Sequence, residues 1–255
     1  MRAAARVVAE RDGERTALRV LKGEAPLLPR RTGPNEVHFV GGAAGPLGGD
    51  DLSVEIEVGP GAVLWVRTVA ASIALPGRDG AESRLSVHAT VADGGRLAWL
   101  PEPTVAAARC RHHTVSSAEL SAGAGLVWRE EVVFGRHGEA PGDIRLSTTI
   151  RRDSRPWYRS DVAVGPSHPG GPAILDGARV LSTLIATHAP TDTWAITDKY
   201  DKSGLVPSPD LSDISYTHQT AAIMALAGGG FVATALADEL AQTRRVTDRL
   251  AGPAQ

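Results

Sequence analysis

The sequence predicts a mainly β protein, built as a solenoid-like stack of antiparallel strands and hairpins with one or two helices. Apolar and polar residues alternate strictly over residues 52–58, as in a half-buried strand. Glycine is abundant, at 28 of 255 residues, which favours many turns. Three similar segments return after about thirty residues, a spacing typical of stacked repeats: VEIEVGPGAVLWV, VHATVADGGRLAWL and AELSAGAGLVWRE.

Each repeat is predicted to be a strand, a tight turn and a second strand. Gly61, Gly94 and Gly123 stand at the turns, where glycine supplies the positive φ that two-residue hairpin connections need. Further hairpins are predicted with turns at Asp12-Gly13 and near Asp153-Ser154. The β pattern therefore extends over most of the chain.

The last third of the chain carries mixed signals. Residues 165–173 and 200–213 are rich in Pro, Gly and Ser and are predicted to be surface loops. The segment GARVLSTLIATHA fits both helix and strand periods, and we favour a strand. Helical spacing of leucine and valine predicts a C-terminal helix over about 236–250, ended by Gly252-Pro253. Nothing marks a linker, so we expect a single domain over residues 1–255.

Composition excludes several classes of protein. The 27 basic and 29 acidic residues give no strong positive field, which argues against a nucleic-acid partner. Cys110 is the single cysteine, so neither an internal disulfide nor a thiolate zinc cluster can form. The N-terminal segment becomes charged before an apolar signal region develops, and no 18-residue apolar run occurs. We therefore expect a cytoplasmic protein without membrane contact.

Two carboxylates fall in line with apolar strand faces. Asp50 precedes Leu52 by two positions, and Glu130 lies between Trp128 and Val132 on one face of its strand. Burying an ionised carboxylate is costly unless it is paired, hydrogen-bonded or bound to a metal. A structural role remains open for both: Asp50 as a cap of the Gly48-Gly49 turn, and Glu130 as the partner of Arg67 or Arg129.

The histidines invite a metal hypothesis. The segment CRHH offers Cys110, His112 and His113, but neighbouring residues of a strand point to opposite faces. We therefore favour exposed strand-edge histidines. A metal-dependent hydrolase with His112, His137 and Glu139 as ligands is the alternative. No sequence motif of a nucleophile elbow, phosphate loop, dinucleotide fingerprint or zinc-protease helix occurs. A carbohydrate-binding β module would need more aromatic residues than the 4% found here.

Four segments in order resemble the urease accessory protein family called UreD or UreH. They are GGDDLSVEIEVGPGAVLWVRT, ADGGRLAWLPEPTV, SAGAGLVWREEVVFGRHGEAPGD and IRRDSRPWYRSDVAVG. The likeness covers roughly residues 1–165. The segment RTVAASIALPG departs from the family pattern, because it lacks a Lys and a Tyr-Arg pair.

The resemblance implies a maturation factor and not an enzyme. A member of this family is expected to bind the accessory protein UreF, to engage the GTPase UreG through it, and to dock on apo-urease. It would help deliver nickel to the urease active site, holding the ion in transit and no cofactor tightly. On this reading Asp50, Glu130, Glu139 and Asp143 are candidates for lining the path of the ion. Oxygen ligands suit that task, because they hold a borderline cation weakly enough to release it.

Overall fold

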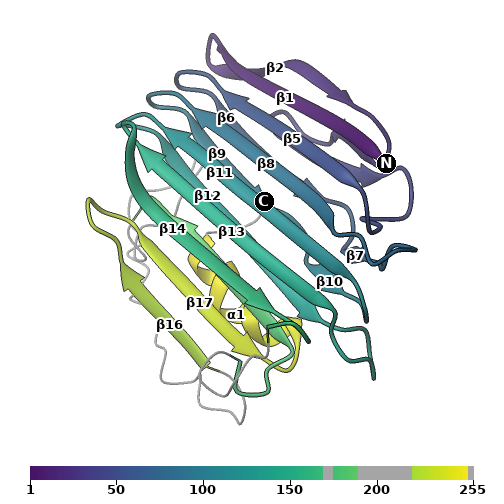
Figure 1. The fold of residues 1–255 in the computed structure, drawn as a ribbon. Coiled ribbons are helices and arrows are strands. Elements are labelled where there is room, and N and C mark those ends of the chain that lie inside the picture. Colours follow the sequence, from purple (N-terminus) through teal and green to yellow (C-terminus); the bar gives the residue numbers. More distant parts are fainter. Residues whose placement is uncertain (169–174, 189–219, 252–255) are drawn as a thin grey trace.

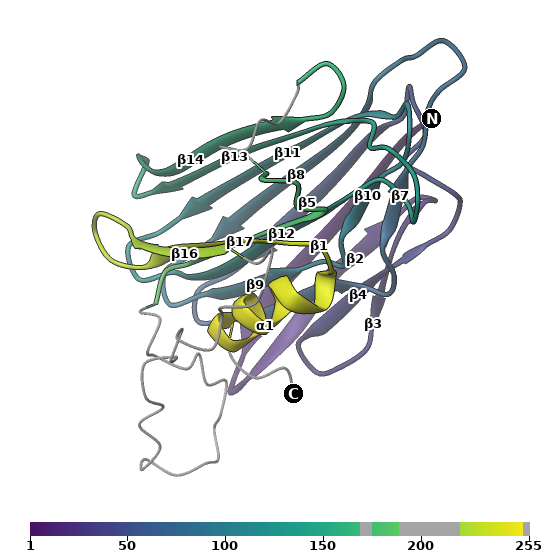
Figure 2. The same cartoon turned by 90° about the horizontal axis from the view of Figure 1, so that it is seen from below.

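Two β-sheets lie face to face, and the chain order follows the length of the stack (Figure 1, Figure 2). The structure is a computed structural model that describes residues 1–168, 175–188 and 220–251. The predicted mainly β, solenoid-like stack with a C-terminal helix is confirmed. The predicted loop over 200–213 lies outside the described residues, as does much of that over 165–173.

The first sheet, sheet A, contains seven strands in the described part of the chain. From one edge to the other they are β14 (Arg155–Val164), β13 (Asp143–Arg152), β11 (Arg111–Leu120), β8 (Ser83–Val91), β5 (Asp51–Val58), β1 (Arg2–Asp12) and β2 (Arg15–Gly23).

The second sheet, sheet B, faces sheet A and carries the helix on its other side (Figure 2). Its strands in order are β16 (Thr220–Ala225), β17 (Phe231–Ala237), β15 (Val180–Ala186), β12 (Gly125–Phe134), β9 (Arg96–Leu100), β6 (Val63–Thr68), β4 (Glu36–Gly41) and β3 (Leu27–Arg31). Two short strands branch from this path, β10 (Thr104–Ala106) on β12 and β7 (Ser72–Ala74) on β10.

The repeats are coils of a solenoid and not hairpins, which corrects the predicted pairing inside each unit. The turn at Gly61 connects β5 of sheet A to β6 of sheet B, and each strand then pairs in parallel with its counterpart in the next coil. Antiparallel pairing occurs towards the ends of the sheets, including the predicted hairpins β1–β2 and β13–β14. The ambiguous segment near residue 180 forms strand β15, as favoured.

The turns of successive coils stack on one another. Gly61 and Gly94 have φ of 65° and 68°, in the left-handed region that glycine adopts without strain. At Gly123 the requirement is space, because a Cβ there would lie 2.3 Å from the Asp93 carboxylate. The Gly123 N–H donates to that carboxylate at 2.9 Å, and the Gly61 N–H donates to the Asp93 carbonyl at 3.2 Å. Small turn residues thus allow each coil to bond the next.

A dense apolar core fills the space between the sheets next to the turns of Gly61, Gly94 and Gly123. Trp99 and Trp128 stack with ring centroids 5.5 Å apart, and Phe39 meets Trp99 edge-on at 6.3 Å. Valine, leucine, isoleucine and alanine from both sheets fill the rest of this core. Side chains alternate along a strand, so the inward faces of the same strands continue beyond this core. Further along the strands these faces carry more polar residues.

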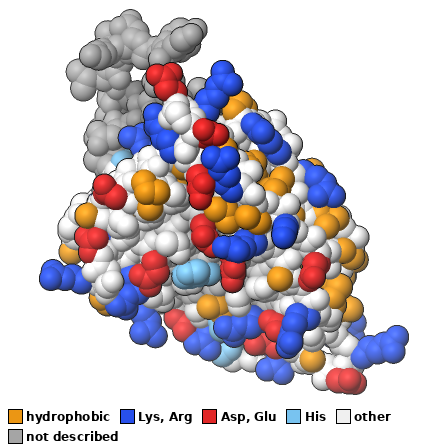
Figure 3. Space-filling model, turned by 90° about the horizontal axis from the view of Figure 1, so that it is seen from above, with side chains coloured by type: hydrophobic (Ala, Val, Ile, Leu, Met, Phe, Trp, Pro, Cys, Tyr) orange, Lys and Arg blue, Asp and Glu red, His pale blue; other side chains and the backbone are white. Residues whose placement is uncertain are grey.

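Helix α1 (Leu240–Ala251) covers the outer face of sheet B. It begins later than predicted, because Leu236 belongs to strand β17. Val246, Leu250 and Ala251 pack on a second apolar cluster that includes Val127 and Leu184. No helix among the described residues is long and apolar enough to cross a membrane. Acidic, basic and hydrophobic side chains are mixed over the face seen in Figure 3, without a continuous field of one sign.

A buried cluster of charges fixes α1 to the sheet. Arg244 of the helix binds Glu131 at 2.7 Å and Glu102 at 3.0 Å. Arg129 binds Asp248 at 2.6 Å and lies 3.5 Å from Glu131, whose side chain is 0% exposed. Burial lowers the pKa of Arg244, but the Glu131 and Glu102 carboxylates raise it further, so that the net change is upward. The charges are therefore held ionised by one another.

Replacing Arg244 by alanine should destabilise the fold. Glu131 would stay buried with Arg129 as its remaining cation, so we expect a loss on the order of 2 to 3 kcal/mol, somewhat below that of a fully unpaired buried charge. Urea unfolding followed by circular dichroism measures this. Arg245→Ala, at the exposed neighbouring position, is the matched control and should change the unfolding free energy little. Equal stability of the two variants would contradict the anchoring role.

Candidate functional site

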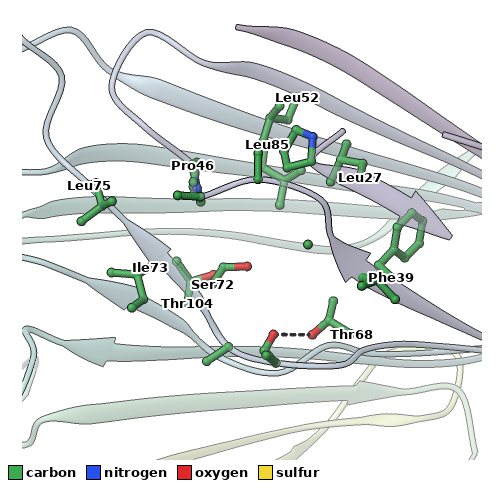
Figure 4. Close-up of a pocket in the computed structure, with 18 of the residues that line it drawn as sticks. Leu27, Phe39, Pro46, Leu52, Thr68, Ser72, Ile73, Leu75, Leu85 and Thr104 are labelled. Atoms are coloured by element: carbon green, nitrogen blue, oxygen red, sulfur yellow. Dashed lines mark hydrogen bonds between the residues drawn. The ribbon is translucent and has the colours of Figure 1, made fainter. Parts of the chain in front are cut away.

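Past the tryptophan core, the space between the sheets opens into a cavity that reaches the surface. This outer cavity has a volume of about 320 Å³, and Figure 4 shows its wall, formed by residues such as Leu27, Phe39, Pro46, Leu52, Thr68, Ser72, Ile73, Leu75, Leu85 and Thr104. Its rim includes the exposed side chains of Val40 and Ile73. The segment after Thr68, where the sequence departs from the family pattern, forms part of this wall.

A smaller inner cavity of about 90 Å³ adjoins the outer one. The two share wall residues, which are Leu27, Phe39, Thr68, Ser72, Leu85 and Thr104. Hydroxyl groups line the inner cavity from both sheets, contributed by Thr68, Ser72, Thr104, Thr114 and Ser116. Glu130 also belongs to its wall. The interior is thus apolar at the turn end and rich in oxygen atoms here.

Glu130 faces the space between the sheets, as its alternation predicts. Its Oε2 accepts a hydrogen bond from Thr148 Oγ1 at 2.7 Å, and its Oε1 lies 3.4 Å from the indole Nε1 of Trp128. Arg67 and Arg129 are not its partners, because Arg67 binds Glu36 and Arg129 binds Asp248. Among the described residues no cation pairs with Glu130. The Thr148 hydroxyl and the Trp128 indole N–H are neutral hydrogen-bond donors, so they compensate only part of the negative charge of Glu130.

Asp50 is buried, with 5% of its surface exposed, next to the loop that lines the outer cavity. Its Oδ1 binds the amino group of Met1 at 2.7 Å, and its Oδ2 accepts from the Leu47 N–H at 2.8 Å. The cap predicted for the Gly48-Gly49 turn is therefore present, with a cation added. Gly45 and Pro46 precede Leu47 in the loop that this carboxylate binds, and they form part of the cavity wall.

Glu139 and Asp143 lie away from these cavities. Arg136 binds Glu139 at 2.7 Å, and this guanidinium lowers the pKa of the carboxyl to about 2. Asp143 begins β13 and accepts from the backbone N–H and the hydroxyl of Ser167, each at 2.8 Å. The structure does not bring the four predicted acids together. Asp50 and Glu130 lie at the cavities, and the ion-path role of Glu139 and Asp143 stays a prediction.

The histidine segment divides as strand geometry predicts, but His112 is not the exposed edge residue that we favoured. His112 points between the sheets and is 1% exposed, whereas His113 points outwards and contacts Ser147. His112 lies on the same strand face as the buried residues Ser116 and Ala118, which explains its burial.

Burial raises the pKa of the Cys110 thiol to about 11, with Asp143 adding to the effect. Cys110 is therefore a neutral thiol at pH 7.

The ligand set of the alternative hydrolase does not assemble. His112 lies in the interior, His137 is exposed on a loop, and Glu139 is bound by Arg136. In residues 1–168, 175–188 and 220–251, no group of three or more His, Cys, Asp or Glu side chains is placed to hold a metal ion. The described residues therefore offer scattered single ligands.

Comparison with known proteins decides the family. The pattern described as UreD urease accessory protein matches residues 1–254. A urease accessory protein UreD of Parafrankia sp. (strain EAN1pec) is 37% identical, over 99% of this chain and 88% of that protein. Relatives of the same name from Streptomyces avermitilis and Streptomyces coelicolor are each 38% identical over 97% of this chain, covering 95% and 94% of their own lengths.

The chain belongs to the UreD family of urease accessory proteins. Its place is therefore among accessory proteins of urease and not among enzymes, as the ordered segments predict.

Sequence reasoning missed three features of this UreD protein. It did not find the ion cluster of Arg129, Glu131 and Arg244, although the outward parity of the first two, between Val127 and Val133, was a signal that something covers that face. Neither did it find Thr148 as the partner of Glu130, or Ser83 as the partner of His112. Those contacts join different coils, which no local pattern reports.

His112 makes stability depend on pH. Burial, with the nearby His113, lowers its pKa from 6.5 to about 4, while hydrogen bonding to Ser83 opposes this change. Between these two pH values the unfolded chain binds more protons than the folded one, so stability falls as the pH drops from 6.5 to 4.

We expect His112 to account for a loss of about 3 kcal/mol between pH 7 and pH 4. Urea unfolding at a series of pH values measures this loss. In His112→Asn that part of the pH slope should vanish, whereas the solvent-facing His88→Asn should keep it. Parallel pH profiles for wild type and His112→Asn would contradict a neutral buried imidazole.

Proposed function

We propose that this UreD protein is a scaffold for urease maturation that passes nickel through the cavities between its sheets. It binds UreF, engages the GTPase UreG through UreF, and docks on apo-urease. Family membership supports the maturation role. The nickel route is supported by one observation above all, which is that Glu130 lies in the wall of the inner cavity and forms no ion pair with a described cation, since Arg129 of the same wall is paired with Asp248 and Glu131.

The chemistry of the cavity wall suits a cation in transit. A divalent ion loses hydration on entering a protein and must be offered other oxygen or nitrogen atoms. The hydroxyls of Thr68, Ser72, Thr104 and Thr114 are neutral oxygens, and Glu130 supplies one negative charge. A full set of carboxylate or thiolate ligands would bind too tightly for release. A row of weak oxygen ligands therefore suits a protein that delivers nickel better than one that stores it.

Asp50 has a different part in this proposal. Its carboxylate is already bound by the Met1 amino group and the Leu47 N–H, so its charge is compensated and its part is to shape the loop at the outer cavity. A cation approaching the cavity meets the loop that Asp50 supports and then, further in, Glu130. The acids thus act at the entrance and in the interior.

Glu130→Gln should lower urease activation several-fold while the accessory complex still forms. Glutamine keeps the shape of the side chain and can accept from Thr148, but it removes the charge that attracts the ion. Urease activity after nickel-dependent maturation, with a pull-down of UreF and apo-urease, separates the two effects. Glu14→Gln, in the exposed turn between β1 and β2, is the matched control and should activate urease as wild type does. Full activation with Glu130→Gln would remove the proposed route.

The scaffold role has its own test. The full-length chain should retain UreF and apo-urease in a pull-down, and UreG should join when UreF is present. Asp50→Ala should lower activation while this assembly persists, because the loop loses its support without loss of the sheets. Lack of association under every nickel and GTP condition would contradict the scaffold role.

A further inference from the structure

His112 is a buried polar side chain in the wall of the outer cavity, and the nickel route described above makes no use of it. It is 1% exposed and extends from β11, whose inward residues continue with Thr114 and Ser116 into the wall of the inner cavity. The imidazole thus stands at the beginning of the row of hydroxyls that leads towards Glu130. A buried ring of this kind must have both nitrogen atoms satisfied.

The contacts of the ring are those of an imidazole that carries its proton on Nδ1. Ser83 Oγ lies 3.3 Å from the Arg111 carbonyl, to which it donates its one proton, and 2.9 Å from His112 Nδ1. A serine hydroxyl has one proton to donate, so when it donates to the carbonyl it can only accept from Nδ1–H. With the proton on Nδ1, Nε2 is unprotonated and accepts from the Thr114 hydroxyl, which lies 3.2 Å from it.

This arrangement is the one that metal-binding histidines use. One ring nitrogen donates to a protein oxygen, which fixes the ring orientation and makes the other nitrogen a better ligand. Ser83 and Thr114 hold the buried ring from its two sides, so that the lone pair keeps one direction. Thr114 supplies an oxygen atom next to that lone pair.

We propose that His112 Nε2, with the Thr114 hydroxyl beside it, is a binding site for a divalent nickel ion in the wall of the outer cavity. The site rests on the proposed function in so far as the ion is nickel on its way to Glu130. One imidazole and one hydroxyl, completed by water, form a weak site for this borderline cation. Weak binding at the entrance favours passage along Thr114 and Ser116.

The first experiment compares nickel binding by three full-length proteins: wild type, His112→Asn and His113→Asn. Asparagine keeps a donor near the position of Nδ1 for Ser83 but has no atom at Nε2. Competition with a chromogenic chelator should show nickel binding at least about tenfold weaker in His112→Asn. His113→Asn, on the opposite face of the same strand, is the matched control and should bind as wild type does. Equal nickel affinity of all three proteins would overturn the proposal.

The second experiment needs no substitution. Nitrogen-detected NMR of the histidine rings at pH 7 should show the His112 proton on Nδ1, and added Ni²⁺ should broaden this ring before those of His88 and His113. A proton on Nε2, or broadening of the exposed rings first, would overturn the site even if a variant failed to fold.

Urease activation separates this inference from the proposed function. If Glu130→Gln lowers activation while His112→Asn leaves nickel binding unchanged, the route stands and the His112 site falls. If His112→Asn weakens nickel binding while both variants activate urease fully, the site stands and the route falls.

Discussion

The in-register parallel pairing of successive coils is the constraint on which the interior depends. Asp50 precedes β5 at the level of Ser83 on β8, and Ser83 is paired with His112 on β11. A shift of one residue in any of these pairings would turn every inward side chain outwards. The hydroxyls, the imidazole and the carboxylate share one space only because backbone hydrogen bonds hold the coils at the same level.

Two adjacent carboxylates of one strand, the fully buried Glu131 and the partly buried Glu130, are accommodated in two different ways. Glu131 is surrounded by the guanidinium groups of Arg129 and Arg244, so its charge is neutralised and its oxygen atoms are occupied. Glu130, on the other face of β12, has a threonine hydroxyl and an indole N–H. The first arrangement binds a helix to a sheet. The second leaves a charge that a mobile cation can neutralise.

Much of this architecture could be predicted from residue patterns, because strand alternation and turn glycines are local signals. Alternation placed Glu130 on the apolar face of β12 and opposed His112 to His113, and the thirty-residue spacing indicated stacked repeats. The pairing of the coils could not be read in this way. A strand, turn, strand pattern fits a hairpin and a solenoid corner equally well, since both need a tight turn. The choice depends on contacts with the next coil.

The same limit explains the error at His112. A polar residue next to another histidine looks exposed when its strand is considered alone, and burial is unfavourable for an unpaired imidazole. The partner that makes burial acceptable, Ser83, lies one coil away. The start of α1 was misplaced for a related reason, because Leu236 fits helical spacing but pairs with Leu181 of β15.

The interior changes character along the strands, and this change supports the proposed passage for an ion. Stacked Trp99 and Trp128 close the turn end with an apolar plug that offers no ligand. Beyond it, threonine and serine side chains of both sheets replace the aliphatic ones around the inner cavity. Each neutral oxygen offsets a part of the hydration that a cation loses, yet none binds it firmly. The fold therefore supplies an apolar wall at one end and a row of neutral oxygen atoms that leads to Glu130, the carboxylate of this wall without an ion pair among the described residues.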